Sequence, residues 1–153
     1  MTGEGKPSII ACIPAYNEEE TIAKVVIQAQ KNVDKVIVCD DGSNDLTGVI
    51  AEGLGAEVLR HERNLGKGAA LRSLFRRAEE LGADVTVTLD GDGQHDPADI
   101  PRLVEPILRG EADVVVGSRY FGGEPAGEGM PRYRRFGLKA VDGFVKRLGR
   151  LPV

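Results

Sequence analysis

The chain has 153 residues, of which 41% are apolar, so one compact domain can form a hydrophobic core without disulfides. The net charge of −4 hides a basic C-terminal segment, because residues 130–153 hold seven basic residues and one acidic residue. This basic segment is short and the chain contains no Trp, which argues against nucleic acid as a partner and favours an anionic membrane surface or a phosphorylated acceptor.

Membrane spans and secretion signals are not evident in the sequence. No apolar run approaches the roughly 18 residues that a membrane span requires, and the N-terminus does not resemble a signal peptide. Cys12 and Cys39 lie in apolar runs, where we expect reduced cysteines that pack as small apolar residues. We therefore expect a cytoplasmic protein that is soluble or at most peripheral at the cytoplasmic membrane face.

Short β-branched runs alternate with longer segments of helical periodicity along the chain. This alternation predicts an α/β fold, a three-layer α/β/α sandwich with a mostly parallel sheet. In chain order, the expected strands are residues 9–13, 36–39, 56–59, 85–89 and 114–116, and the expected helices are residues 19–31, 46–54, 68–81 and 98–109.

Polar residues follow four of the five expected strands. In open parallel sheets, ligands bind outside the carboxyl ends of the strands. The sequence therefore predicts a binding site on this edge. The four polar segments are P-A-Y-N-E at 14–18, D-D-G-S at 40–43, D-G-D-G-Q at 90–94 and G-S-R at 117–119.

Asp90, Asp92 and Gln94 occupy every second position after the fourth expected strand. In an extended segment they would point the same way, and their oxygens suit Mg²⁺ or Mn²⁺. The alternative is a solvated acidic turn. A calcium-binding loop is excluded because it requires Gly and Glu where this chain has His95 and Pro101. We expect His95 to shape the loop by hydrogen bonding.

Asp40 and Asp41 end the second expected strand, where a carboxylate usually accepts hydrogen bonds from a ribose or a base. The alternative is an ordinary turn that caps the following helix. Tyr16 and Asn17 suit the frame of a nucleobase. Residues 19–20 are expected only to place favourable acidic charge in the first turn of the next helix.

The segment N-L-G-K-G at residues 64–68 precedes the third expected helix. Its glycines and Lys67 can approach a diphosphate at the N-terminus of that helix. The segment lacks the Walker pattern, and no G-x-G-x-x-G follows the first strand, which disfavours a dinucleotide-dependent dehydrogenase. We expect His61, just before this segment, to lie on the surface.

Taken together and in this order, the motifs P-A-Y-N-E, D-D-G-S, N-x-G-K-G, D-G-D-G-Q-H and G-S-R resemble family-two glycosyltransferases with a GT-A fold. They are similar in particular to the dolichyl- and polyprenyl-phosphate sugar synthases. The resemblance implies a nucleotide-sugar and metal-binding core at residues 1–121, followed at 122–153 by a flexible loop and a basic amphipathic helix. It also implies a metal-dependent, inverting transfer of a hexose from a GDP-mannose or UDP-glucose type of donor to a polyprenyl or dolichyl phosphate.

The resemblance implies roles for individual residues. Asp90, Asp92 and Gln94 would hold Mg²⁺ or Mn²⁺, and Asp92 would act in catalysis. Arg119 would position the acceptor phosphate, and Arg132 would belong to a second basic element that assists it. A lipid phosphate is already anionic, so no strong general base is required. The donor would be surrounded by Pro14, Tyr16, Glu18, Asp40, Asp41 and Lys67, together with Asp90 and Gln94.

Two other classes of function stay open. A sugar-nucleotide-binding module would bind donor and metal without forming product, whereas a nucleotidyltransferase would release pyrophosphate but would carry a glycine-rich signature that is missing after the first strand. Members of the resembled branch usually continue well beyond the equivalent of Arg135, so we expect the acceptor site to be incomplete. An apolar stripe at residues 141–148 predicts a helix that packs on the domain or a partner, or contacts lipid headgroups.

Overall fold

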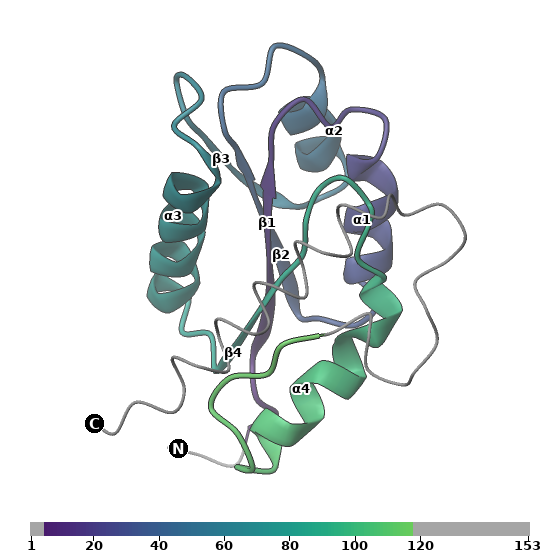
Figure 1. Cartoon of the computed structure of the whole chain (residues 1–153), viewed down its shortest axis with the longest axis vertical. Coiled ribbons are helices and arrows are strands. Elements are labelled where there is room, and N and C mark those ends of the chain that lie inside the picture. The colour runs from purple at the N-terminus through teal and green to yellow at the C-terminus, as the bar shows by residue number, and fades with distance from the viewer. Residues whose placement is uncertain (1–4, 118–153) are drawn as a thin grey trace, which may run out of the picture. The chain divides into compact units, whose positions relative to one another are not determined.

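A parallel β-sheet with strand order β3-β2-β1-β4 forms the centre of the structure, a computed structural model that describes residues 5–117 (Figure 1). The strands are β1 (Ile9–Ala15), β2 (Lys35–Asp40), β3 (Glu57–Arg60) and β4 (Val85–Thr88). The helices are α1 (Ile22–Ala29), α2 (Thr47–Gly53), α3 (Lys67–Glu80) and α4 (Ile100–Leu108), the last preceded by the 3-10 turn η1 (Pro97–Asp99).

Different helices cover the two faces of the sheet, so the structure has three layers (Figure 1). On one face, Ile10 and Cys12 of β1 pack against Leu74 of α3. On the other face, Ile13 of β1 belongs to a larger cluster that includes Val25 of α1 and residues of α2 and α4. Successive residues of β1 therefore face opposite layers, as the pleat of a strand requires. The predicted α/β class is confirmed, and every pairing among the described strands is parallel.

The order of the strands reverses at β1. The chain runs from β1 outward to β2 and β3, and then returns to place β4 on the other side of β1. In a doubly wound sheet, this reversal leaves a crevice outside the carboxyl ends of the two strands that flank it. Here those strands are β1 and β4, so the topology directs a ligand toward the residues that follow Ala15 and Thr88.

The predicted strand at residues 114–116 is wrong. Val114 and Val116 expose 78% and 83% of their surface, and no strand is assigned to this run. Among the described residues, β4 pairs only with β1, so the run has no ladder partner to satisfy its backbone hydrogen bonds. An apolar run of three residues does not make a strand without such a partner.

The start of α1 also differs from the prediction. The helix begins at Ile22, and its first turn holds no acidic residue, so the expected role of residues 19–20 is wrong. The backbone turns before the helix, because Thr21 N and Ile22 N both donate to Glu18 O. The side chain of Glu19 instead accepts a hydrogen bond from Leu46 N at 3.1 Å, in the loop before α2.

Several predictions concern residues outside the described range of 5–117. These are the basic amphipathic helix, the segment at residues 122–153, and the positions of Arg119 and Arg132. Within the described range, no helix has the length and apolar character needed to cross a membrane.

Candidate functional site

The carboxyl edge of the sheet brings together the loops that follow β1, β2, β3 and β4. Asp41 N donates to Ala15 O at 2.9 Å, which joins the ends of β2 and β1. Gly91 lies against the end of β1, where a Cβ would stand 3.1 Å from the Cβ of Ala15. A Cβ at this position would crowd Ala15, so the loop after β4 packs closely on the end of β1. Three of the four polar segments that the sequence predicted to meet, at 14–18, 40–43 and 90–94, are therefore neighbours, whereas residues 118–119 of the fourth lie outside the described residues.

The loop after β4 is a turn, and the expected extended arrangement of Asp90, Asp92 and Gln94 is wrong. Gly93 has a φ of 74°, a left-handed conformation that favours glycine, and it reverses the chain within the motif. Gln94 N donates to Asp92 Oδ1 at 2.9 Å inside this turn. Asp90 N donates to His95 Nδ1 at 3.1 Å, which confirms that His95 shapes the loop.

Lys67 reaches across to this loop from the first turn of α3. Its Nζ lies 2.6 Å from Asp90 Oδ1, and the two side chains are 61% and 31% exposed. A positive charge therefore already stands at the first carboxylate of the predicted metal motif. Asp90 therefore presents an oxygen that is accessible to a cationic group, and carboxylate and amide oxygens are the donor types that suit a hard divalent ion such as Mg²⁺ or Mn²⁺.

Over residues 5–117, no group of three or more His, Cys, Asp or Glu side chains is placed to hold a metal ion. The predicted ligands are two carboxylates and the amide of Gln94, so a metal ion held by them would need water and phosphate oxygens to complete its coordination. Mg²⁺ characteristically binds in this way, through one or two carboxylates and a substrate phosphate.

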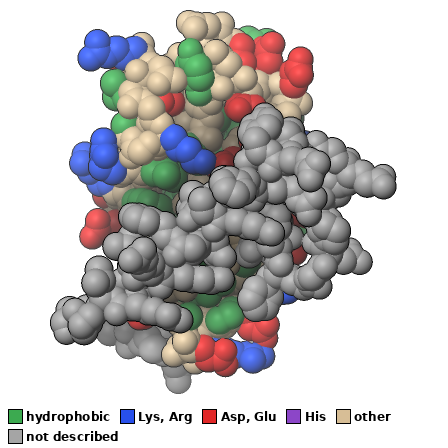
Figure 2. All heavy atoms as spheres, viewed as in Figure 1, with side chains coloured by type: hydrophobic (Ala, Val, Ile, Leu, Met, Phe, Trp, Pro, Cys, Tyr) green, Lys and Arg blue, Asp and Glu red, His purple; other side chains and the backbone are tan. Residues whose placement is uncertain are grey.

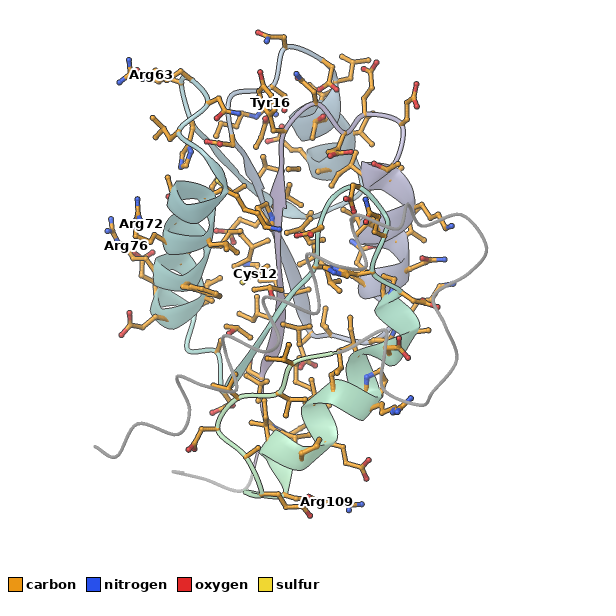
Figure 3. The ribbon with its side chains drawn as sticks, in the orientation of Figure 1. Cys12, Tyr16, Arg63, Arg72, Arg76 and Arg109 are labelled. Atoms are coloured by element: carbon orange, nitrogen blue, oxygen red, sulfur yellow. The ribbon has the colours of Figure 1, made fainter. Side chains whose placement is uncertain are left out.

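The loops after β1 and β2 are hydrogen-bonded to each other. Asn17 N donates to Ser43 Oγ at 3.0 Å, and Asn44 N donates back to Asn17 Oδ1 at 2.9 Å. Asn17 adopts a positive φ of 53°, a conformation that Asn tolerates better than most residues. Tyr16 stands at the carboxyl end of β1 and is 42% exposed, so its ring is available to a ligand (Figure 3). Pro14, two residues earlier and inside β1, is buried.

Thr21 is a site residue that the sequence reasoning missed. Its Oγ1 donates to Gly91 O at 2.7 Å and also lies 3.1 Å from Glu18 Oε2. Glu18 N in turn donates to Thr47 Oγ1 at 2.8 Å, at the start of α2. Glu18 and Thr21 therefore connect the loop after β4 to the starts of α1 and α2, and Glu18 lies where the donor is expected.

Asp40 and Asp41 are buried, with 8% and 3% of their surface exposed. Asp40 Oδ1 accepts a hydrogen bond from Ser43 N at 2.9 Å and so closes the turn after β2. Asp41 accepts from Leu65 N at 3.0 Å and from Gly66 N at 2.8 Å, just before α3. Burial alone would raise the pKa of Asp41, but the hydrogen bonds from Leu65, His61 and Gly66 outweigh it and lower that pKa.

The prediction that His61 lies on the surface is wrong. Its side chain is 13% exposed, and its Nδ1 lies 2.6 Å from Asp41 Oδ1. The loop after β3 folds back over the end of β2, which brings the imidazole beside Asp41. A usable signal was present in the sequence, because His61 directly follows the third strand and therefore starts from the same edge as the other motifs.

A polar hollow of about 260 Å³ opens beside Asp40 at the same edge. Pockets that enclose a whole small ligand usually measure roughly 300–1,000 Å³, so this hollow suits one part of a nucleotide sugar. It is lined by Asp40, Ser43, Asn44, Asp45, Arg60 and His61, among others.

Of the arginines labelled in Figure 3, Arg63 lies on the loop after β3 at the carboxyl end of the sheet, and the other three lie away from it. Arg72 and Arg76 project from the outer side of α3, and Arg109 lies at the far end of α4. Figure 2 shows basic side chains over the α3 side of this face and acidic side chains over the α1 and α2 side. The arginines expected to handle the acceptor, Arg119 and Arg132, lie outside the described residues.

Comparison with known proteins identifies the class. The chain belongs to Glycosyl transferase family 2, whose family model matches residues 10–151. It is 41% identical over 129 residues to the UDP-N-acetylglucosamine–dolichyl-phosphate N-acetylglucosaminyltransferase of Methanococcus voltae, which covers 72% of this chain and 51% of that protein. It is 38% identical over 118 residues to the undecaprenyl-phosphate mannosyltransferase of Micrococcus luteus, covering 72% of this chain and 48% of that protein.

A solved structure supports the same class. Glucosyl-3-phosphoglycerate synthase from Mycobacterium tuberculosis, in complex with Mn²⁺, UDP-glucose and phosphoglyceric acid, superposes with a TM-score of 0.58 and 36% sequence identity. The match covers 69% of this chain and 41% of that one. The predicted family and its GT-A fold are confirmed. The chain spans about half the length of the curated relatives that it matches.

Proposed function

We propose that this chain forms the donor-binding part of an inverting glycosyltransferase that moves a hexose from a nucleotide-diphosphate sugar to a polyprenyl or dolichyl phosphate. One observation carries the proposal. Lys67 Nζ lies 2.6 Å from Asp90 Oδ1 at the carboxyl edge, on the loop that packs against the end of β1. This places a cationic side chain and a carboxylate motif together at the point where the strand order reverses, which is where sheets of this type bind nucleotides.

The chemistry of the donor explains why both charges are needed. Transfer of the sugar breaks the anomeric bond and leaves a nucleoside diphosphate with growing negative charge. The ammonium group of Lys67 stabilises that charge, and so does the amino end of α3 on which it stands. A divalent ion held by Asp90, Asp92 and Gln94 would act as a Lewis acid on the same diphosphate.

We assign the nucleoside part of the donor to the loops after β1 and β2. Tyr16 offers an exposed aromatic ring at the rim, and the polar hollow beside Asp40 offers hydrogen-bonding groups for a ribose or base. We assign Pro14, Glu18 and Asp41 to the frame of this region. Pro14 and Asp41 are buried, while Glu18 N is tied to α2 and its carboxylate to Thr21.

On the acceptor side, the proposal assigns the phosphate to Arg119 and Arg132, because guanidinium groups match phosphate oxygens in a bidentate manner. A phosphate acceptor is already anionic and needs orientation more than deprotonation. The relatives from Methanococcus and Micrococcus are both named for transfer to a lipid phosphate, which supports this class of acceptor. Such an acceptor also implies peripheral contact with the cytoplasmic face of the membrane.

The relatives use different donor sugars. The relatives' names include N-acetylglucosamine and mannose, and the solved structure holds UDP-glucose. Our sequence-based expectation of a GDP-mannose or UDP-glucose type therefore extends to UDP-N-acetylglucosamine. All three donors belong in the test.

The test is transfer by the purified chain. Each radiolabelled donor is incubated with polyprenyl phosphate and either Mn²⁺ or Mg²⁺, and label is counted in the organic phase. We expect label in that phase with one donor, lost on chelation of the metal and in Asp92→Asn, since an amide is a poorer ligand for a hard cation. Asp99→Asn is the matched control, because Asp99 is exposed on η1, and it should behave as wild type.

Two results would contradict the proposal. Failure of the chain to bind any of the three donors in the presence of metal would contradict the donor site, and release of pyrophosphate from sugar phosphate and nucleotide would indicate a nucleotidyltransferase. Donor binding without product would identify this chain by itself as a sugar-nucleotide-binding module. Full activity in Asp92→Asn would remove the metal motif from the mechanism.

A further inference from the structure

We infer that His61 is a positioning residue of the donor site, which holds Asp41 and the loop before α3 so that Lys67 faces Asp90. The inference rests on the proposed function, since it concerns how the same site is held. His61 connects three elements. Its Nδ1 lies 2.6 Å from Asp41 Oδ1 after β2, and its Nε2 lies 3.0 Å from Ser73 Oγ on α3. Nε2 is also 3.6 Å from Cys39 Sγ in β2.

The contact with Asp41 fixes the role of one imidazole nitrogen. The ionised carboxylate of Asp41 can only accept hydrogen bonds, so Nδ1 of His61 donates to it. The hydroxyl of Ser73 can donate or accept, so its contact with Nε2 is satisfied whether or not Nε2 carries a proton.

Asp41 is the point around which the loop closes. Its buried carboxylate accepts from three donors, which are the ring of His61 and the backbone N–H groups of Leu65 and Gly66. These donors belong to both ends of one loop, so a single carboxylate closes that loop on itself. Gly42 allows the loop after β2 to pack closely on the loop after β3. Its backbone is left-handed, and a Cβ at this position would overlap the backbone of Arg63.

The closed loop leads directly into the donor site. Gly66 is the N-cap of α3, and the next residue is Lys67, whose Nζ meets Asp90 Oδ1. A movement of the loop at Gly66 would therefore also move Lys67, which is the next residue. Without the imidazole, Asp41 would keep only its backbone donors inside a buried pocket, and the loop would move to admit water to the carboxylate.

Displacement of a positioned group by about 1 Å can cost on the order of 100-fold in rate, so we expect losses of about 10- to 100-fold from a disturbed loop. A role in simple core packing would give a different pattern. Packing depends on volume, whereas positioning depends on the hydrogen bond from Nδ1 to Asp41.

Substitution of His61 by Asn and by Gln distinguishes a positioning role from a packing role. The amide nitrogen of Asn can stand where Nδ1 of His stands, and that of Gln where Nε2 stands. His61→Asn therefore keeps the donor to Asp41, His61→Gln keeps only the contact toward Ser73, and His61→Ala keeps neither. We expect the transfer rate of His61→Asn to stay within about threefold of the wild-type rate. We expect the transfer rates of His61→Gln and His61→Ala to fall by about 10- to 100-fold.

The experiment measures the affinity of the full chain for UDP and for GDP with Mn²⁺ by calorimetry, and kcat and KM for transfer to polyprenyl phosphate. Thermal unfolding is followed for every variant. Val85→Ala is the destabilised control, because Val85 is buried at the opposite, amino end of β4. It should lower the unfolding temperature and leave nucleotide affinity unchanged.

The inference is supported if nucleotide affinity follows the order wild type, Asn, then Gln and Ala, without matching the order of unfolding temperatures. It is overturned if Gln and Asn behave alike, or if His61→Ala binds as wild type does. If the wild type binds neither UDP nor GDP, the proposed function itself fails and this inference fails with it.

Discussion

Replacing Lys67 by Met should strengthen Mn²⁺ binding when no nucleotide is present. The ammonium group of Lys67 lies 2.6 Å from Asp90 Oδ1, so it occupies the oxygen that a metal ion would use. An entering ion must break this ion pair or accept its repulsion. Met has a similar length and no charge, so it frees Asp90 and removes the repulsion without opening a gap.

The size of the effect follows from the exposure of the pair. Lys67 and Asp90 are 61% and 31% exposed, so the pair belongs to the weak, solvent-screened class. Such pairs contribute about 0.2–1 kcal/mol, which corresponds to a gain of about 1.4- to 5-fold in Mn²⁺ affinity. With UDP or GDP bound the sign should reverse, because Lys67 then neutralises the diphosphate, and its loss should weaken binding of the metal and nucleotide together.

Electron paramagnetic resonance of free Mn²⁺ measures both affinities directly, at low and at physiological salt. Lys31→Met is the control, because it makes the same change in net charge at the exposed end of α1 away from the site. An unchanged or weaker Mn²⁺ affinity in Lys67→Met without nucleotide would refute the idea that Lys67 holds the place of the metal.

Three further outcomes are expected from the structure. Gly42→Ala should lower both stability and nucleotide affinity, because a Cβ would overlap the backbone of Arg63; Gly82→Ala, which has a similar φ but open space around it, should cost only about 1–2 kcal/mol of stability, as seen by urea unfolding. Hydrogen bonds from Lys35 and Arg77 lower the pKa of Glu57, so the stability they give is present at neutral pH and is lost as the pH falls below the ordinary value of 4.5. Glu57→Gln should therefore reduce the loss of stability at acid pH in unfolding curves. An unchanged loss of stability at acid pH would contradict the assignment. Burial raises the pKa of Cys12 to about 11 and that of Cys39 to about 12, so neither thiol should react with a disulfide reagent at pH 8 until the protein is unfolded.

The sequence patterns were sufficient to predict the strands of the sheet and the edge of the sheet that carries the candidate site. Alternating short apolar runs and helical segments predicted β1 to β4 and the four helices to within a few residues, because element type depends on local periodicity. The placement of the loop after β4 beside the end of β1 was also predictable, because the carboxyl ends of parallel strands meet at one edge. The run at 114–116 was misread, since an apolar run carries no information on whether a partner strand is present.

The contacts that hold the site were decided by the tertiary structure. Asp41 and Gly66 are separated by 25 positions, and Lys67 and Asp90 by 23, so no local pattern could pair them. His61 looked like a surface residue until the closure of its own loop placed it beside a buried carboxylate. Periodicity and motif order thus determined which elements form and which family the chain resembles. Which side chain meets which depends on how loops close over one another, and that is set by packing between segments distant in the sequence.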